Sequence, residues 1–114
     1  MNYSNEYYEL EENIKTLTRA LDDALQRLRK LEENILQIDE SLPKYEEELL
    51  HERDELRKLV LREKCGEKIA YVFYKLQFHR IDCLKGYIKA YKLEKKDCLS
   101  ERKTIIRKLS KRLK

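Results

Sequence analysis

Two side chains in the second half of the chain have a spacing that could support metal binding or nucleophilic chemistry. His79 and Cys83 are four residues apart, which places both on one face of a helix. Zinc normally takes four ligands at compact spacing, and Cys65 and Cys98 lie too far away in sequence to complete such a set. A cysteine nucleophile also needs a base that a third group orients, and the chain offers neither that group nor a glycine-rich loop. The sequence therefore predicts no enzyme activity, no catalytic residue, no metal site and no cofactor.

Basic side chains gather near the C-terminus, where they could neutralise phosphate groups. The last thirty residues hold 12 Lys and Arg against 3 Asp and Glu, and the rings of Tyr87 and Tyr91 could stack on bases. A charged helical face is usually only solvated, however, and the acidic first half of the chain could supply the counter-charge. Nucleic-acid binding is therefore the second hypothesis for function, and its residues would be Lys103, Arg107, Lys108, Lys111 and Arg112.

The two halves of the chain carry opposite charges. Residues 1–55 have a net charge of −9 and residues 56–114 a net charge of +13, which together give +4. Complementary ends favour an antiparallel arrangement, either within one chain or between two. We divide the chain into an acidic coiled-coil region, residues 1–64, and a basic, aromatic-rich helical region, residues 65–114.

The elements that must position these side chains are helices, and the clearest of them opens the chain. From Tyr3 to Leu42, positions spaced alternately by four and three residues are all apolar or aromatic. This heptad spacing marks a seam along one side of a helix that packs against another helix. Either a second copy or the chain's own later helices must cover the seam, because one helix cannot bury it alone. We predict a self-association interface formed by Leu10, Ile14, Leu17, Leu21, Leu28, Leu31, Ile35, Ile38 and Leu42.

Leu42-Pro43 is the main break in this pattern, and it has two interpretations. The heptad series continues in phase as Tyr45, Leu49 and Leu56, with Glu52 out of place, which favours a bent helix that runs on. Alternatively, the chain turns back at Pro43 into a hairpin, because proline is tolerated in the first turn of a new helix. Further on, Cys65-Gly66 is a typical helix end, since glycine adopts the left-handed angles that close a helix.

Residues 69–93 are rich in aromatic and β-branched side chains. Their apolar positions follow helical spacing, but part of the stretch also alternates as a strand would. We favour a helix that is apolar nearly all round and so offers a surface to another protein. Aromatic side chains often anchor such interfaces, and the predicted partner-binding residues are Tyr71, Tyr74, Phe78, Tyr87 and Tyr91.

Composition excludes several classes of protein. Charged residues make up 42% of the chain, with only 2 Gly and 1 Pro, which is typical of long helices rather than of sheets joined by turns. No run of about 18 apolar residues is present to span a membrane. Three cysteines without a CxxC pair form a poor disulfide framework, and the N-terminal residues do not resemble a signal peptide, so we expect free thiols in the cytoplasm or nucleus.

These observations predict an all-α, elongated protein: a long coiled-coil helix followed by one or two further helices, arranged as a helical bundle or a kinked coiled coil. The predicted function is that of a non-enzymatic protein that self-associates, most simply as a homodimer, and also binds a protein partner as a scaffold, adaptor or small inhibitor. The second hypothesis is a dimeric regulator that binds nucleic acid through the basic C-terminal third.

Overall fold

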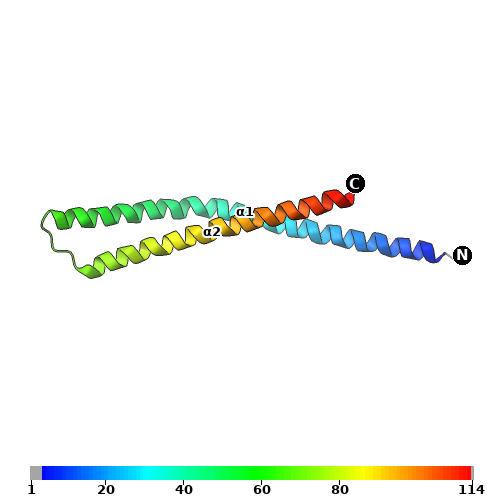
Figure 1. Ribbon diagram of the computed structural model, residues 1–114, viewed down its shortest axis with the longest axis horizontal. Coiled ribbons are helices and arrows are strands. Elements are labelled where there is room, and N and C mark those ends of the chain that lie inside the picture. Colours follow the sequence, from blue (N-terminus) through cyan, green and yellow to red (C-terminus); the bar gives the residue numbers. More distant parts are fainter. Residues whose placement is uncertain (1–3, 114) are drawn as a thin grey trace.

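The protein is an elongated helical hairpin about 93 Å long (Figure 1). The computed structural model describes residues 4–113, in which helix α1 (Asn5–Lys64) and helix α2 (Tyr71–Leu113) run antiparallel and no strand occurs. Tyr3, the first member of the predicted seam, and Lys114 lie outside the described residues. The all-α, elongated fold expected from the sequence is confirmed, with two helices rather than three.

Helix α1 begins at a sequence-encoded cap and continues through its proline. The Ser4 hydroxyl accepts a hydrogen bond from the Tyr7 N–H at 3.2 Å, and Glu6 lies in the positively polarised first turn. Pro43 lies inside the helix, on its exposed side. The prediction that the helix continues past Pro43 is therefore confirmed, and the alternative of a hairpin turn at Pro43 is wrong. Because the register is kept, Tyr45 and Leu49 remain half-buried on the side that carries the seam.

The chain reverses direction after Lys64. Gly66 has a φ of 97°, the left-handed conformation that favours glycine. Its N–H donates to the carbonyl of Glu63 and the next N–H, that of Glu67, donates to the carbonyl of Arg62, which together close the helix in a Schellman motif. The Arg62 guanidinium also holds the Glu67 carboxylate at 2.6 and 2.7 Å. The predicted helix end at Cys65-Gly66 is therefore confirmed, and it is the hairpin turn.

Residues 71–113 form one continuous helix, so the helical interpretation of the aromatic stretch is confirmed and the strand alternative is wrong. The most buried side chains of α2 repeat at heptad spacing, which shows that α2 carries a seam of its own. They are Gln77, Ile81, Leu84, Ile88 and Cys98.

The core is a narrow line between the two helices. Leu31 is only 1% exposed and packs in a cluster with Ile35 and Cys98, against which Leu99 and Ile105 also lie. Burial raises the pKa of the Cys98 thiol, so this cysteine behaves as a small apolar core residue.

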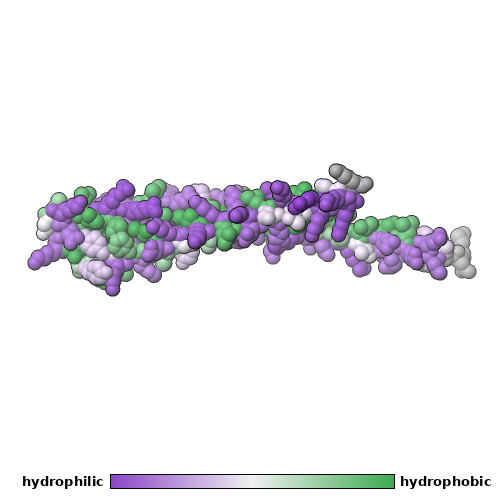
Figure 2. Space-filling view, in the orientation of Figure 1, coloured by the Kyte–Doolittle hydropathy of each residue, from purple (hydrophilic) through white to green (hydrophobic). Residues whose placement is uncertain are grey.

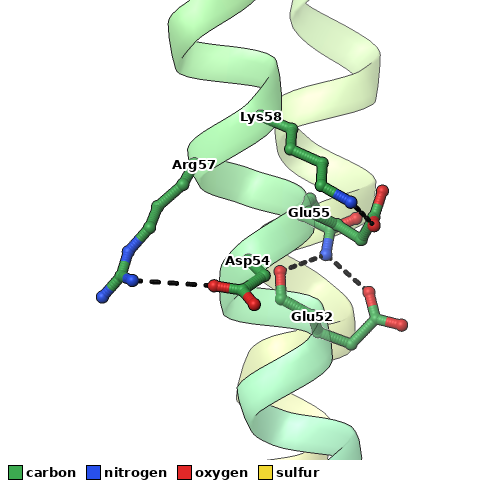
Figure 3. Close-up of polar contacts among 6 residues, drawn as sticks. Glu52, Asp54, Glu55, Arg57 and Lys58 are labelled. Atoms are coloured by element: carbon green, nitrogen blue, oxygen red, sulfur yellow. Dashed lines mark hydrogen bonds and ion pairs between the residues drawn. The ribbon is translucent and has the colours of Figure 1, made fainter.

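Glu52, which interrupts the seam of α1, has a polar counterpart on α2. The amide nitrogen of Gln77 donates to the Glu52 carboxylate at 2.5 Å and to its main-chain carbonyl at 2.7 Å (Figure 3). Gln77 is the one buried polar side chain among residues 4–113. A polar pair of this kind penalises displacement of one helix by a turn, because both groups would then face apolar neighbours.

Candidate functional site

The seam predicted to bind a second copy is covered along most of its length by the chain's own second helix. Leu31, Ile35 and Ile38 are buried between α1 and α2, and the members on either side of them are half-buried. Within this hairpin these side chains are therefore occupied by an intramolecular contact. The half-buried members are Leu21, Leu28 and Leu42.

The first part of the seam extends beyond the end of α2. Residues 5–19, which we call the overhang, are all exposed, and the seam members Tyr7, Leu10, Ile14 and Leu17 have exposed fractions between 46% and 59%. Figure 1 shows this part of α1 reaching past the C-terminal end of α2. Figure 2 shows hydrophobic surface along one side of the protruding end. Within residues 4–113, the overhang is therefore a helix whose apolar stripe is not covered by α2.

Ion pairs between the helices follow the opposite charges of the two halves. Three acidic residues of α1, spaced seven apart, lie beside basic residues of α2. Exposed pairs contribute little stability each, but a repeated series disfavours other registers. The pairs are Glu32–Arg102 at 2.6 Å, Asp39–Lys95 at 2.5 Å and Glu46–Lys92 at 3.7 Å.

A fourth pair between the helices has the reverse polarity and two-point geometry. The guanidinium of Arg27 donates to both carboxylate oxygens of Glu101 at 2.7 and 2.8 Å. These hydrogen bonds, with the charge of Arg27, lower the pKa of Glu101 below its ordinary value of 4.5. Two parallel hydrogen bonds fix the orientation of this pair more closely than a single contact does.

The lowered pKa of Glu101 predicts a pH dependence of stability. Because the folded-state pKa lies below the unfolded value of 4.5, the contribution is complete above that pH and is lost as the pH falls through the folded-state pKa. We expect E101Q to unfold at lower denaturant concentration than the parent near neutral pH, and the difference to vanish in acid. Urea titrations at a series of pH values measure this. E33Q is the control, because Glu33 is exposed and lies outside the ion pairs of residues 4–113. If E101Q remained less stable than the parent in acid, the loss of stability would not come from the ion pair with Arg27.

The predicted partner-binding aromatics divide into two groups. Tyr71, Phe78 and Tyr87 are exposed. Tyr74 is half-buried, and its hydroxyl donates to the carboxylate of Glu63, which raises the Tyr74 pKa. The half-buried ring of Tyr91 stacks on Tyr45 of α1 with centroids 5.5 Å apart. Tyr74 and Tyr91 thus hold the helices together. The exposed ring of Tyr87 also contacts Tyr45, with centroids 5.8 Å apart, so Tyr71 and Phe78 are the predicted aromatics without a ring contact to α1 in the described part of the chain.

His79 and Cys83 lie side by side, as their spacing predicts, with the sulfur 3.6 Å from the histidine Nε2. Both are exposed. In residues 4–113 no group of three or more His, Cys, Asp and Glu side chains is arranged to hold a metal ion. No helix in the same range is long and apolar enough to cross a membrane.

The basic residues predicted to contact nucleic acid are all exposed on the last part of α2. None of them takes part in the ion pairs found among residues 4–113. These residues are Lys103, Arg107, Lys108, Lys111 and Arg112.

Beside this basic cluster lies a groove that the sequence reasoning did not single out. It is shallow, has a volume of about 610 Å³, and is lined by Leu99 and Ile106 with Arg102, Lys103 and Arg107. Its signal was present in the sequence: Leu99, Ile106 and Leu113 are seven residues apart and form a second stripe next to the one that contains Cys98 and Ile105. The tail of α2 therefore has more apolar surface than one neighbouring helix can cover.

Comparison with protein-family models, with characterised proteins and with solved structures found no match. Function must therefore be argued from the surfaces of the hairpin itself.

Proposed function

We propose that this protein is a non-enzymatic interaction module that self-associates through its overhang and presents a second surface to another protein. The observation that carries the proposal is the exposed heptad stripe of residues 5–19, in register with the covered seam. A stripe of this length and spacing is typical of a helix that packs against another helix.

The energy available from the overhang is sufficient for association at moderate concentration. Burying a large apolar side chain completely is worth about 1.5–3 kcal/mol, so covering four that are roughly half exposed is worth about 3–6 kcal/mol for each copy. Two copies in a symmetric dimer contribute twice that sum, from which the entropic cost of association must be subtracted. We expect a reversible dimer rather than a permanent one.

Charged substitutions in the overhang are expected to abolish self-association without unfolding the hairpin. L10D/I14D places two carboxylates in the stripe, and in a symmetric dimer each copy carries both, so the association constant should fall by at least about 100-fold. Sedimentation equilibrium over a wide concentration range measures this. The matched control is L36D/L50D, at positions on α1 that are similarly exposed but lie outside the stripe. A parent protein that is a monomer throughout would contradict the proposal.

Exposed aromatic and apolar side chains near the hairpin turn support the second part of the proposal. Tyr71 and Phe78 lie there with Val72, Phe73 and Leu76, and all five are exposed. Aromatic side chains that stay exposed in a folded chain are common at protein interfaces. The turn lies at the opposite end of the hairpin from the overhang (Figure 1), so one copy could occupy one end while another protein occupies the other. That arrangement is typical of a scaffold or adaptor.

Nucleic-acid binding is the second candidate, and the exposed basic cluster of α2 is the observation that favours it. Five basic side chains outside any ion pair in the described part of the chain could neutralise phosphates. Titration of labelled duplex and single strands at low and high salt distinguishes this function. Binding that weakens steeply with salt, and that K108E/K111E removes, would support it.

A further inference from the structure

The overhang and the apolar stripe at the end of α2 have similar lengths. The overhang is residues 5–19, and the apolar stripe that contains the groove spans residues 99–113, so each is about 22 Å long at 1.5 Å per residue. Both carry exposed apolar side chains: Ile106 and Leu113 have exposed fractions of 49% and 74%, whereas Leu99 is half-buried. The stripe is thus long enough to lie along the whole overhang.

Their charges are complementary as well. Residues 5–19 carry a net charge of −2, and Glu6 and Glu11 occupy the positions that flank the stripe. Residues 99–113 carry a net charge of +5, with Lys103 and Arg107 on the edge of the groove. An acidic helix with an apolar stripe therefore faces, in a second copy, an apolar groove with a basic edge.

We propose that the overhang of one copy docks in the groove at the end of α2 of a second copy, and that the second copy does the same in return. This inference rests on the proposed self-association and names the surface that receives the overhang. The two hairpins point in opposite directions, and each overhang runs parallel to the α2 that it contacts. At each end of the contact, the overhang becomes the third helix beside α1 and α2 of the other copy.

The alternative dimer, in which two overhangs pair only with each other, uses the available surface less well. It brings together two segments that each carry a net negative charge, which is unfavourable. It also leaves Leu99 and Ile106 in contact with solvent. The reciprocal arrangement is closed by a two-fold axis and covers both apolar surfaces at once.

Charge reversal with rescue tests the proposal on the full-length chain. In sedimentation equilibrium at low salt, E6K/E11K and K103E/R107E are each expected to weaken the dimer by about tenfold or more. Combined in one chain, the four substitutions restore opposite charges across the contact, and the association constant should return to within about threefold of the parent value. Circular dichroism confirms that each variant keeps its helix content.

K85E/K89E is the control for a change of net charge, because both lysines are exposed on α2 away from the groove and outside the ion pairs of residues 4–113. It should weaken the dimer less than K103E/R107E does. The inference is overturned by a combination of three results: L10D/I14D abolishes association, K103E/R107E weakens the dimer no more than K85E/K89E, and the variant with all four charge reversals shows no rescue. In that case the overhangs pair with each other. A parent chain that never associates overturns the proposed function itself.

Discussion

Replacing Leu31 with alanine is expected to lower the free energy of unfolding by about 2–4 kcal/mol. Leu31 is 1% exposed, and it lies at the centre of the cluster that joins the two helices with Ile35 and Cys98. Alanine removes most of its contacts and leaves a cavity that a two-helix core can close only by moving one helix. Because a domain of this size is stabilised by about 5–15 kcal/mol in total, the loss should be evident as a lower urea midpoint.

L36A is the matched control for this substitution. Leu36 is on the same helix five residues away, and its side chain is 60% exposed. The change in helix propensity is identical at the two sites, so the difference between the variants isolates burial against α2. We expect L36A to change stability by less than about 0.5 kcal/mol. Equal effects of L31A and L36A would mean that α2 does not cover this part of the seam in solution.

The helices themselves could be predicted because local signals agree with the tertiary contacts. Ser4 is a capping residue placed one position before α1, and Gly66 adopts the left-handed conformation that closes the C-terminal end of α1. The heptad series crosses Pro43 in phase, and the structure keeps that phase in one continuous helix. Each of these signals lies within a few residues of the feature that it determines.

The element that covers the seam could not be predicted in the same way. A heptad stripe specifies that some helix must pack on it, but an identical stripe serves a second copy or a later part of the same chain. The decision depends on where the chain reverses and on how α2 pairs with α1. Glu52, which interrupts the heptad series, is part of that pairing, because it accepts hydrogen bonds from Gln77 of α2. Its meaning is visible only when both helices are in place.

The candidate site depends on a difference in length between the two helices. α1 has 60 residues and α2 has 43, so a hairpin that turns at residues 65–70 must leave part of α1 unpaired. Leu10, Ile14 and Leu17 lie in that part, whereas Leu31 and Ile35 belong to the same series but lie in the core. The sequence pattern treats these residues alike, and only the register of the hairpin separates the binding surface from the core.

Replacing Pro43 with alanine is expected to stabilise the hairpin by about 1–3 kcal/mol. A proline inside a helix lacks the N–H that would donate to the carbonyl four residues earlier, here that of Asp39, and its ring crowds that carbonyl, at a cost of about 3 kcal/mol. Alanine restores the hydrogen bond, and because Pro43 is exposed no packing is lost. Part of the gain is offset, by about 0.4–1 kcal/mol, because proline also restricts the unfolded chain.

The measurement is the urea midpoint of P43A against the parent, with K44A as the control at the adjacent exposed position. K44A exchanges one good helix former for another and should change stability by less than about 0.5 kcal/mol. A stabilised P43A that dimerises as the parent does would show that the proline is a local cost within a continuous α1. If P43A is only as stable as K44A, α1 is interrupted at residue 43 in solution. In an interrupted helix, alanine at this position would have no helical hydrogen bond to form.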